Sequence, residues 1–180
     1  MSNALPLEFR LSRLTVASLR NLCDANRVTG YSNLVKEELV RFVMDSFDEA
    51  TLDEFCAAQE EIYFVENMAK AIKWASNPRI VDIDPRSGRS RVDAVFTLRR
   101  SDGWEVYNVR FVNHTTEDIA TSCECMDARD KGYFCAHQMA VLVRCLMLGL
   151  FTLDQWTGPM TPEAEDLINA NVFRRRRPSR

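Results

Sequence analysis

The apolar residues of the first 47 positions recur at the i, i+3, i+4 spacing of one face of an α-helix. Thr15 is a suitable N-cap for a first helix, and the segment 27–33, which contains Gly30, is predicted to be a turn. A second helix follows, with an apolar face made of Val35, Leu39, Val40, Val43 and Phe47. We therefore predict a helix–turn–helix hairpin over residues 1–47.

Helical periodicity continues in a longer segment that ends before Pro78, because proline interrupts helices. Thr51 and Glu54 have the spacing of a capping box, which predicts that this helix opens at Leu52 and extends to about Trp74. Its outward positions include the acidic residues Glu60, Glu61 and Glu66. We interpret these glutamates as a solvated surface, with a docking face for a basic partner as the alternative.

From Ile80 the hydrophobic period changes to two, which is the period of a β-strand. Alternation over Val92–Arg99 and again over Val106–Val112, with the turn Ser101-Asp102-Gly103 between them, predicts a β-hairpin. A third short strand is expected around Ile119–Cys123. The change of period marks the start of the β part of the chain.

A polar loop, Met126–Tyr133, precedes an apolar helix over Ala136–Leu148 that Gly149 stops. Thr161-Pro162-Glu163 is a typical start for a last helix, which leads into a basic tail. We therefore predict an α+β fold in four parts: a helical hairpin (1–47), a linking helix (48–79), a module of β-hairpin and helix (80–150), and a C-terminal helix with its tail (151–180).

The composition is that of a folded chain. Of the 180 residues, 46% are hydrophobic and 27% are charged, which excludes wholesale disorder. No apolar run approaches the ~20 residues needed to cross a bilayer, and Met1–Arg10 lacks the pattern of a secretory signal. We expect a soluble intracellular protein with no membrane partner and no small-molecule substrate.

The charge is distributed unevenly. The formal net charge is −3, and residues 48–80 hold 7 acidic against 3 basic residues, whereas both ends of the chain are slightly basic. Any contact with nucleic acid is therefore expected to be local rather than spread over the whole surface.

Three of the six cysteines cluster with a histidine in the pattern C-x-C-x9-C-x-H, formed by Cys123, Cys125, Cys135 and His137. Thiolate sulfur and imidazole nitrogen are the donors of tetrahedral zinc sites, so the pattern predicts a closed, structural Zn²⁺ site. Ordinary buried cysteines are one alternative, and a redox pair is another, although C-x-C matches redox chemistry poorly. The other cysteines, Cys23, Cys56 and Cys145, are predicted to lie in the core, and His114 to lie in a loop.

The run Val106–Met126 with its C-x-C, closed by Phe134–Leu142 with its C-x-H, resembles a SWIM zinc finger. In that family a β-hairpin carries C-x-C and a helix begins at C-x-H. The resemblance implies zinc at the four residues named above, and a module that binds DNA or protein rather than an enzyme.

The N-terminal hairpin resembles the SAP-like and Rho N-terminal helical motifs over Leu14–Leu22 and Gly30–Val40. In those families the hairpin binds DNA or RNA. The resemblance implies contacts from the basic residues Arg20, Arg27, Lys36 and Arg41. Glu37 and Glu38 flank Lys36 and weaken the basic field, so a purely structural hairpin is the alternative.

The sequence therefore favours a non-enzymatic zinc protein that binds nucleic acid, DNA rather than RNA, through the helical hairpin, the zinc module and the basic tail. The tail contributes Arg174, Arg175, Arg176 and Arg177, a run that also fits a nuclear address. The alternative function is a protein–protein adaptor that docks through the zinc module or the acidic helix. An enzyme is the third hypothesis, and no residue can be nominated for catalysis.

Overall fold

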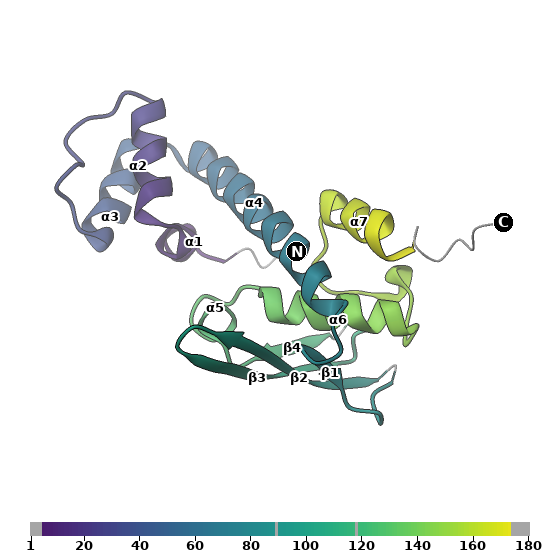
Figure 1. The fold of residues 1–180 in the computed structure, drawn as a ribbon. Coiled ribbons are helices and arrows are strands. Elements are labelled where there is room, and N and C mark those ends of the chain that lie inside the picture. Colours follow the sequence, from purple (N-terminus) through teal and green to yellow (C-terminus); the bar gives the residue numbers. More distant parts are fainter. Residues whose placement is uncertain (1–4, 89, 118, 174–180) are drawn as a thin grey trace. The chain divides into compact units, whose positions relative to one another are not determined.

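The computed structural model describes residues 5–88, 90–117 and 119–173 (Figure 1). The chain divides into two compact units, the N-terminal unit Met1–Ile62 and the C-terminal unit Tyr63–Arg180. Each unit has its own hydrophobic core, and no residue belongs to both cores among the described positions. The combination of helices with one antiparallel sheet confirms the predicted α+β class.

The N-terminal unit is helical, with α1 (Leu7–Arg13), α2 (Val16–Ala25), α3 (Lys36–Ser46) and the first part of α4 (Glu49–Ala75). The predicted N-cap of α2 is confirmed, because the Thr15 hydroxyl accepts a hydrogen bond from the Ser18 backbone N–H at 3.0 Å. Helix α1 was not predicted. The core of this unit is formed by Leu11, Leu14, Leu19, Leu22, Cys23, Leu39, Val40, Val43, Leu52 and Cys56.

The predicted start of α4 at Leu52 is wrong, because the helix begins at Glu49. The Asp48 carboxylate is the capping group: it accepts the Thr51 backbone N–H at 2.9 Å and the Thr51 hydroxyl at 2.8 Å. An aspartate just before the helix accepts the N–H of the third helical residue, so Thr51 lies inside the first turn. The prediction took Thr51 as the cap in place of Asp48, three residues earlier.

The C-terminal unit contains a four-stranded antiparallel sheet in the order β1-β2-β3-β4. Its strands are β1 (Val81–Ile83), β2 (Arg91–Arg100), β3 (Gly103–Val112) and β4 (Ala120–Cys123). Strands β2 and β3 pair along their whole length, from Arg91 opposite Val112 to Arg100 opposite Gly103, which confirms the hairpin and its short turn. The predicted third strand is β4, whereas β1 was not predicted.

Helix α6 (Ala136–Leu148) packs on one face of this sheet (Figure 1). The side chains that the two elements bury together include Val92, Phe96, Phe111, Met139 and Leu142. Gly149 ends α6 in the left-handed conformation with φ 70°, as predicted. The sheet and α6 thus form the two layers between which the cysteine cluster lies.

Shorter elements complete the C-terminal unit: α5 (Met126–Arg129), the 3-10 turn η1 (Leu153–Gln155), α7 (Pro162–Ile168) and the π-helical segment η2 (Asn169–Phe173). The Thr161 hydroxyl caps α7 by accepting the Ala164 backbone N–H at 3.3 Å, which confirms the predicted helix start. No helix in the described part of the chain is both long and apolar enough to cross a membrane.

Candidate metal centre

Three elements of the C-terminal unit deliver the four predicted ligands to one point. Cys123 ends β4, Cys125 is the N-cap of α5, and Cys135 is the N-cap of α6, with His137 in the first turn of that helix. The three sulfur atoms and one histidine ring nitrogen all lie within 4.8 Å of one another. The structure therefore brings together all four residues of the C-x-C-x9-C-x-H pattern in a cluster that can hold a metal ion.

Backbone N–H groups near the sulfurs act to lower the thiol pKa values: that of Cys125 acts on Cys123, that of Ala128 on Cys125 and that of Gln138 on Cys135. The last two effects follow from the positions of Cys125 and Cys135 just before a helix, where the first N–H groups have no partner within the helix. A hydrogen bond donated to a thiolate stabilises its negative charge, so the backbone is arranged for ionised sulfur.

Gln138 holds the second pair of ligands in place. Its side-chain Oε1 accepts the Cys135 backbone N–H at 2.9 Å, while the Cys135 sulfur accepts the Gln138 backbone N–H. This reciprocal pair is a capping box in which cysteine replaces the usual serine or threonine. Gln138 was not predicted as part of the site, although the spacing Cys135-x-x-Gln138 carries that signal.

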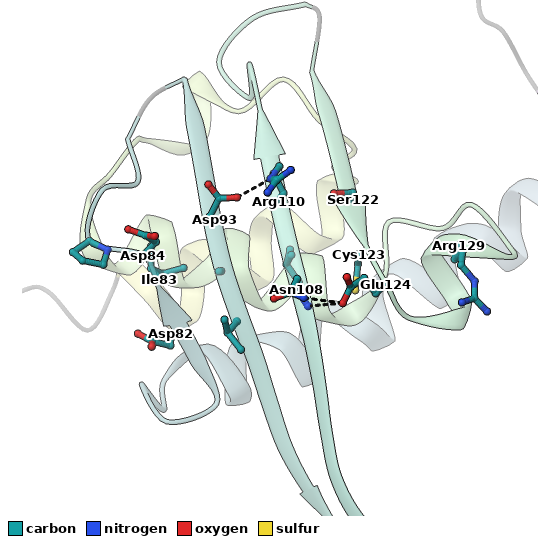
Figure 2. A pocket seen from close by; sticks show the side chains of 14 residues that line it. Asp82, Ile83, Asp84, Asp93, Asn108, Arg110, Ser122, Cys123, Glu124 and Arg129 are labelled. Atoms are coloured by element: carbon teal, nitrogen blue, oxygen red, sulfur yellow. Dashed lines mark hydrogen bonds and ion pairs between the residues drawn. The ribbon is translucent and has the colours of Figure 1, made fainter.

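Glu124 fixes the C-x-C segment to the neighbouring strand. Its Oε2 accepts hydrogen bonds from Asn108 on β3, from the backbone N at 3.3 Å and from Nδ2 at 2.9 Å (Figure 2). Because Glu124 lies between Cys123 and Cys125 in sequence, these bonds restrain the turn that aims both sulfurs inward. Neither Glu124 nor Asn108 was predicted, since their meeting depends on strand register.

His137 presents Nδ1 to the sulfurs, at 3.8 Å from the Cys123 Sγ and 3.9 Å from the Cys135 Sγ. Aromatic rings surround its imidazole: Phe96 and Tyr107 have ring centroids 4.5 Å away, and the Trp74 ring is stacked at 6.0 Å. These rings limit rotation of the imidazole and exclude water from one side of the cluster.

The thiol groups titrate as one unit in the absence of a cation. Hydrogen bonds from the Cys123 and Cys135 thiols lower the pKa of Cys125, so this sulfur carries the first negative charge. The same proton sharing with Cys125 raises the pKa of Cys123 to about 11, and hydrogen bonding with Cys123 raises the pKa of Cys135. Further ionisation therefore requires a positive charge at the centre, which is what a divalent cation provides.

The segment between the two ligand pairs is fastened to α4. The Tyr63 hydroxyl donates to the Asp127 Oδ2 at 3.3 Å, and the Tyr63 ring stacks on Tyr133 with centroids 4.2 Å apart. Lys131 also pairs with the Asp127 carboxylate at 2.8 Å. These contacts order the loop that joins Cys125 to Cys135, and burial raises the pKa of Tyr63 so that its hydroxyl stays protonated.

A groove of about 700 Å³ lies on the sheet next to the C-x-C segment (Figure 2). Two of the carboxylates that line it form ion pairs, with Arg110 Nε 2.7 Å from Asp93 Oδ1 and Nη2 of the neighbouring Arg86 2.8 Å from Asp84 Oδ2. Hydrogen bonds from Arg86 and Arg91 stabilise the ionised carboxylates, which lowers the pKa of Asp84 to about 2 and lowers the pKa of Asp93. Most of the charged groups that line the groove are therefore already paired within the protein.

Four of the eight residues predicted to bind nucleic acid, Arg20, Arg27, Lys36 and Arg41, lie in the N-terminal unit. Arg20 Nη2 donates to the Ser32 backbone carbonyl at 3.1 Å, so this side chain holds the turn between α2 and α3. Arg27 and Arg41 are exposed, and Lys36 is half-buried. Residues Arg174 to Arg177 lie outside the described residues.

The remaining cysteines and His114 lie in apolar surroundings. Cys23, Cys56 and Cys145 are buried as predicted, and desolvation raises the pKa of each thiol, that of Cys145 to about 12. His114 occupies a turn, as predicted, but its side chain is fully buried against Phe111 and Phe151, with centroids 6.4 and 4.5 Å away. Neither ring nitrogen of His114 has a hydrogen-bond partner among the described residues.

Comparison of the chain with family models, with curated proteins and with solved structures finds no match to any of the three. The likeness to SWIM and SAP-like motifs therefore consists of the residues and spacings quoted above.

Proposed function

We propose that this chain is a non-enzymatic zinc protein that binds nucleic acid, with Zn²⁺ held by Cys123, Cys125, Cys135 and His137 as in a SWIM-type finger. The observation that carries the proposal is the convergence of three sulfurs and one imidazole nitrogen within 4.8 Å. This donor set is one of those that hold structural zinc in proteins. Four protein donors complete a tetrahedral shell, which leaves no position for a substrate or an activated water.

The proposed role of the site is to fix the end of β4 and the start of α6 in one geometry. The backbone N–H groups already stabilise the thiolate charges, and Gln138 and Glu124 orient the two ligand pairs. When bound, zinc neutralises most of the thiolate charge and contributes folding free energy on the order of 10 kcal/mol at neutral pH. The result is a rigid surface for recognition rather than a reaction centre.

Nucleic acid is the proposed partner because exposed basic side chains that have no carboxylate partner among the described residues occur in both units. Arg27 and Arg41 are exposed in the N-terminal unit, and Arg99 is exposed in the C-terminal unit. Two linked weak contacts provide avidity even when neither surface is strongly basic. We propose DNA as the principal target and the Arg174–Arg177 run as an additional phosphate contact.

The zinc proposal is tested by elemental analysis of the purified full chain. We expect one zinc per chain, retained through gel filtration, and loss of that zinc in Cys135→Ala. The matched control is Cys56→Ala, which removes a buried cysteine of the other unit and leaves the zinc content unchanged. A metal-free protein, or equal zinc in both variants, would overturn the proposal.

The nucleic-acid proposal is tested by electrophoretic mobility shift with single-stranded and duplex oligonucleotides. We expect binding that weakens steeply as salt rises, since phosphate contacts release counterions. Recovery of one stoichiometric protein partner together with no shift of DNA or RNA would replace this function with that of an adaptor.

A further inference from the structure

The outward face of the β2–β3 ribbon exposes apolar side chains at the end that carries the turn. Alternate residues of a strand point to opposite faces, and the inward residues of this ribbon pack in the core with α6. On the outward face Val95 is 40% exposed, Val106 is 55% exposed and Trp104 is 67% exposed. Trp104 is the most exposed large hydrophobic side chain in the described part of the chain.

An arginine accompanies this tryptophan. Arg99 lies directly opposite Trp104 across the ribbon, and its guanidinium carbon is 6.0 Å from the centroid of the indole ring. The pair places a cation over one face of the indole ring, and Val106 lies beside Trp104 on the same face of the ribbon. We call Arg99, Trp104 and Val106 the stacking face.

The charge of the ribbon favours an anionic partner. Its outward positions hold three arginines, Arg91, Arg99 and Arg110, against one carboxylate, Asp93. Asp93 is shared between Arg91 and Arg110, with Arg110 at 2.7 Å, so its charge is already neutralised. Glu105 is opposite Leu98 in the register and therefore belongs to the inward face.

The acidic residues on the outward face of the sheet lie toward the other end of the ribbon. Asp82 pairs in register with Val95, which is four positions from Arg99 along β2, a separation of about 13 Å at ~3.3 Å per residue. The stacking face therefore has a cation and an aromatic ring without an adjacent outward carboxylate on the two strands.

We propose that the stacking face binds single-stranded nucleic acid, with one base stacked on Trp104 and the adjoining phosphate paired with Arg99. This inference rests on the proposed nucleic-acid function and specifies its site and strandedness. An exposed aromatic ring beside an arginine is suited to a single strand, because every base has a π face and only an unpaired strand exposes it. In a duplex the base faces are hidden within the stack, so the indole has no surface to cover.

The test is a titration of the zinc-loaded full chain with oligo(dT), followed by tryptophan fluorescence. Trp104 is exposed, whereas Trp74 is half-buried and Trp156 is buried, so quenching on binding reports on Trp104. We expect Trp104→Ala to weaken binding about 5- to 150-fold, the range for loss of one stacked base, and Trp104→Phe to retain most of the affinity. Oligo(U) and a duplex of the same length distinguish RNA from DNA and single from double strands.

A second variant separates the cation from the ring. Arg99→Gln should weaken binding and reduce the slope of log affinity against log salt by about 0.7, the value for one phosphate contact on a single strand. The matched control is Arg79→Gln, because Arg79 is also an exposed arginine of the C-terminal unit but lies outside the ribbon. Zinc content and circular dichroism establish that each variant is folded.

The outcomes distinguish this inference from the function on which it rests. Binding of oligo(dT) that is unaffected by Trp104→Ala and causes no quenching would overturn the stacking face and leave the nucleic-acid function intact. Tighter binding of the duplex than of the single strand would also overturn the stacking face and leave the nucleic-acid function intact. Absence of binding to every oligonucleotide would overturn both, and a protein partner lost in Trp104→Ala would assign the face to an adaptor.

Discussion

The two units of this chain are stabilised in different ways. In the N-terminal unit, helices bury a continuous set of apolar side chains, and its ion pairs, such as Arg10 with Asp53 at 2.7 Å, lie near the surface. In the C-terminal unit, a sheet and α6 also bury an apolar core, but four polar donors converge at its edge. The N-terminal unit is therefore stabilised by many apolar contacts. In the C-terminal unit, part of the stability is expected to depend on the cluster of four donors.

Buried helical leucines serve different purposes in the two units. Leu39 on α3 and Leu142 on α6 are both fully buried leucines within helices. Only α6 begins with ligands, so only its packing is linked to the position of metal donors. Removal of the metal should consequently destabilise the C-terminal unit alone, whereas truncation of a buried side chain should destabilise whichever unit contains it.

The largest expected effect comes from removal of the metal. Chelation of the full chain should destabilise the C-terminal unit by on the order of 10 kcal/mol, because zinc binding is coupled to folding. Hydrogen exchange should then show loss of amide protection in β2, β3 and α6, with protection of α2 and α3 retained. Equal loss of amide protection in both units, or no loss in either, would contradict the expectation that the metal stabilises the C-terminal unit.

The next largest effect distinguishes the two leucines. Leu39→Ala and Leu142→Ala should each cost about 2–5 kcal/mol, the range for truncating a buried leucine. Leu142→Ala should also weaken zinc affinity, since α6 carries Cys135 and His137, whereas Leu39→Ala should leave it unchanged. Denaturant titration and competition with a zinc chelator measure the two quantities, and equal zinc affinities would contradict the expected linkage.

A pH-dependent effect should also be confined to the C-terminal unit. Burial lowers the pKa of His114, so the unfolded chain takes up the proton at higher pH than the folded chain does. Stability is fully present above the unfolded value of about 6.5 and decreases as pH falls below it, by at most about 1.4 kcal/mol per pH unit.

The measurement is the free energy of unfolding at pH 7.5 and pH 5.5 in the wild type and in His114→Leu. Because the metal ligands also take up protons in acid, the informative quantity is the difference between the two proteins. The variant should lose less stability on acidification than the wild type, and parallel pH profiles would show that His114 contributes nothing.

An effect on the position of the ligands is expected at Gln138. Gln138→Ala removes the acceptor for the Cys135 backbone N–H and should cost about 1–3 kcal/mol, together with about a tenfold loss of zinc affinity. Gln138→Glu keeps an acceptor at this position and should retain most of the stability. Chelator competition compares the variants, and equal affinity in the alanine and glutamate variants would exclude a positioning role.

Much of the fold was predictable because the hydrophobic period changes clearly along the chain. Helical spacing located α2 and α3, an apolar run that ends at Gly149 located α6, and the period of two located β2 and β3. The four cysteine and histidine donors were predictable because they lie close together in sequence, and zinc donor types are few. Short elements such as α1 and β1 have too few residues for a period to emerge.

The supporting residues of the site were harder to predict, since they meet through tertiary structure. Asn108 reaches Glu124 only because Val109 is in register with Cys123, and a sequence does not state which residues of two strands face one another. Trp74 stacks on His137 from a different helix. The burial of His114 was not predicted, because its sequence neighbours Asn113 and Thr115 are polar. Its closer aromatic contact, Phe151, comes from a distant part of the chain, whereas Phe111 lies on the preceding strand.

The loop between Cys125 and Cys135 has a consequence for the search for homologous sequences. Gly132 lies there on the exposed surface with φ 62°, and a Cβ placed at it would meet no neighbour within 4 Å. The entropic cost of loop closure grows slowly with length, by about 0.6 kcal/mol for each doubling, so extra residues at this exposed position cost little as long as the contacts of Asp127 and Tyr133 are kept. Homologues should therefore vary in the gap while keeping Cys-Glu-Cys and Cys-x-His-Gln, and a search profile ought to leave the spacer length free.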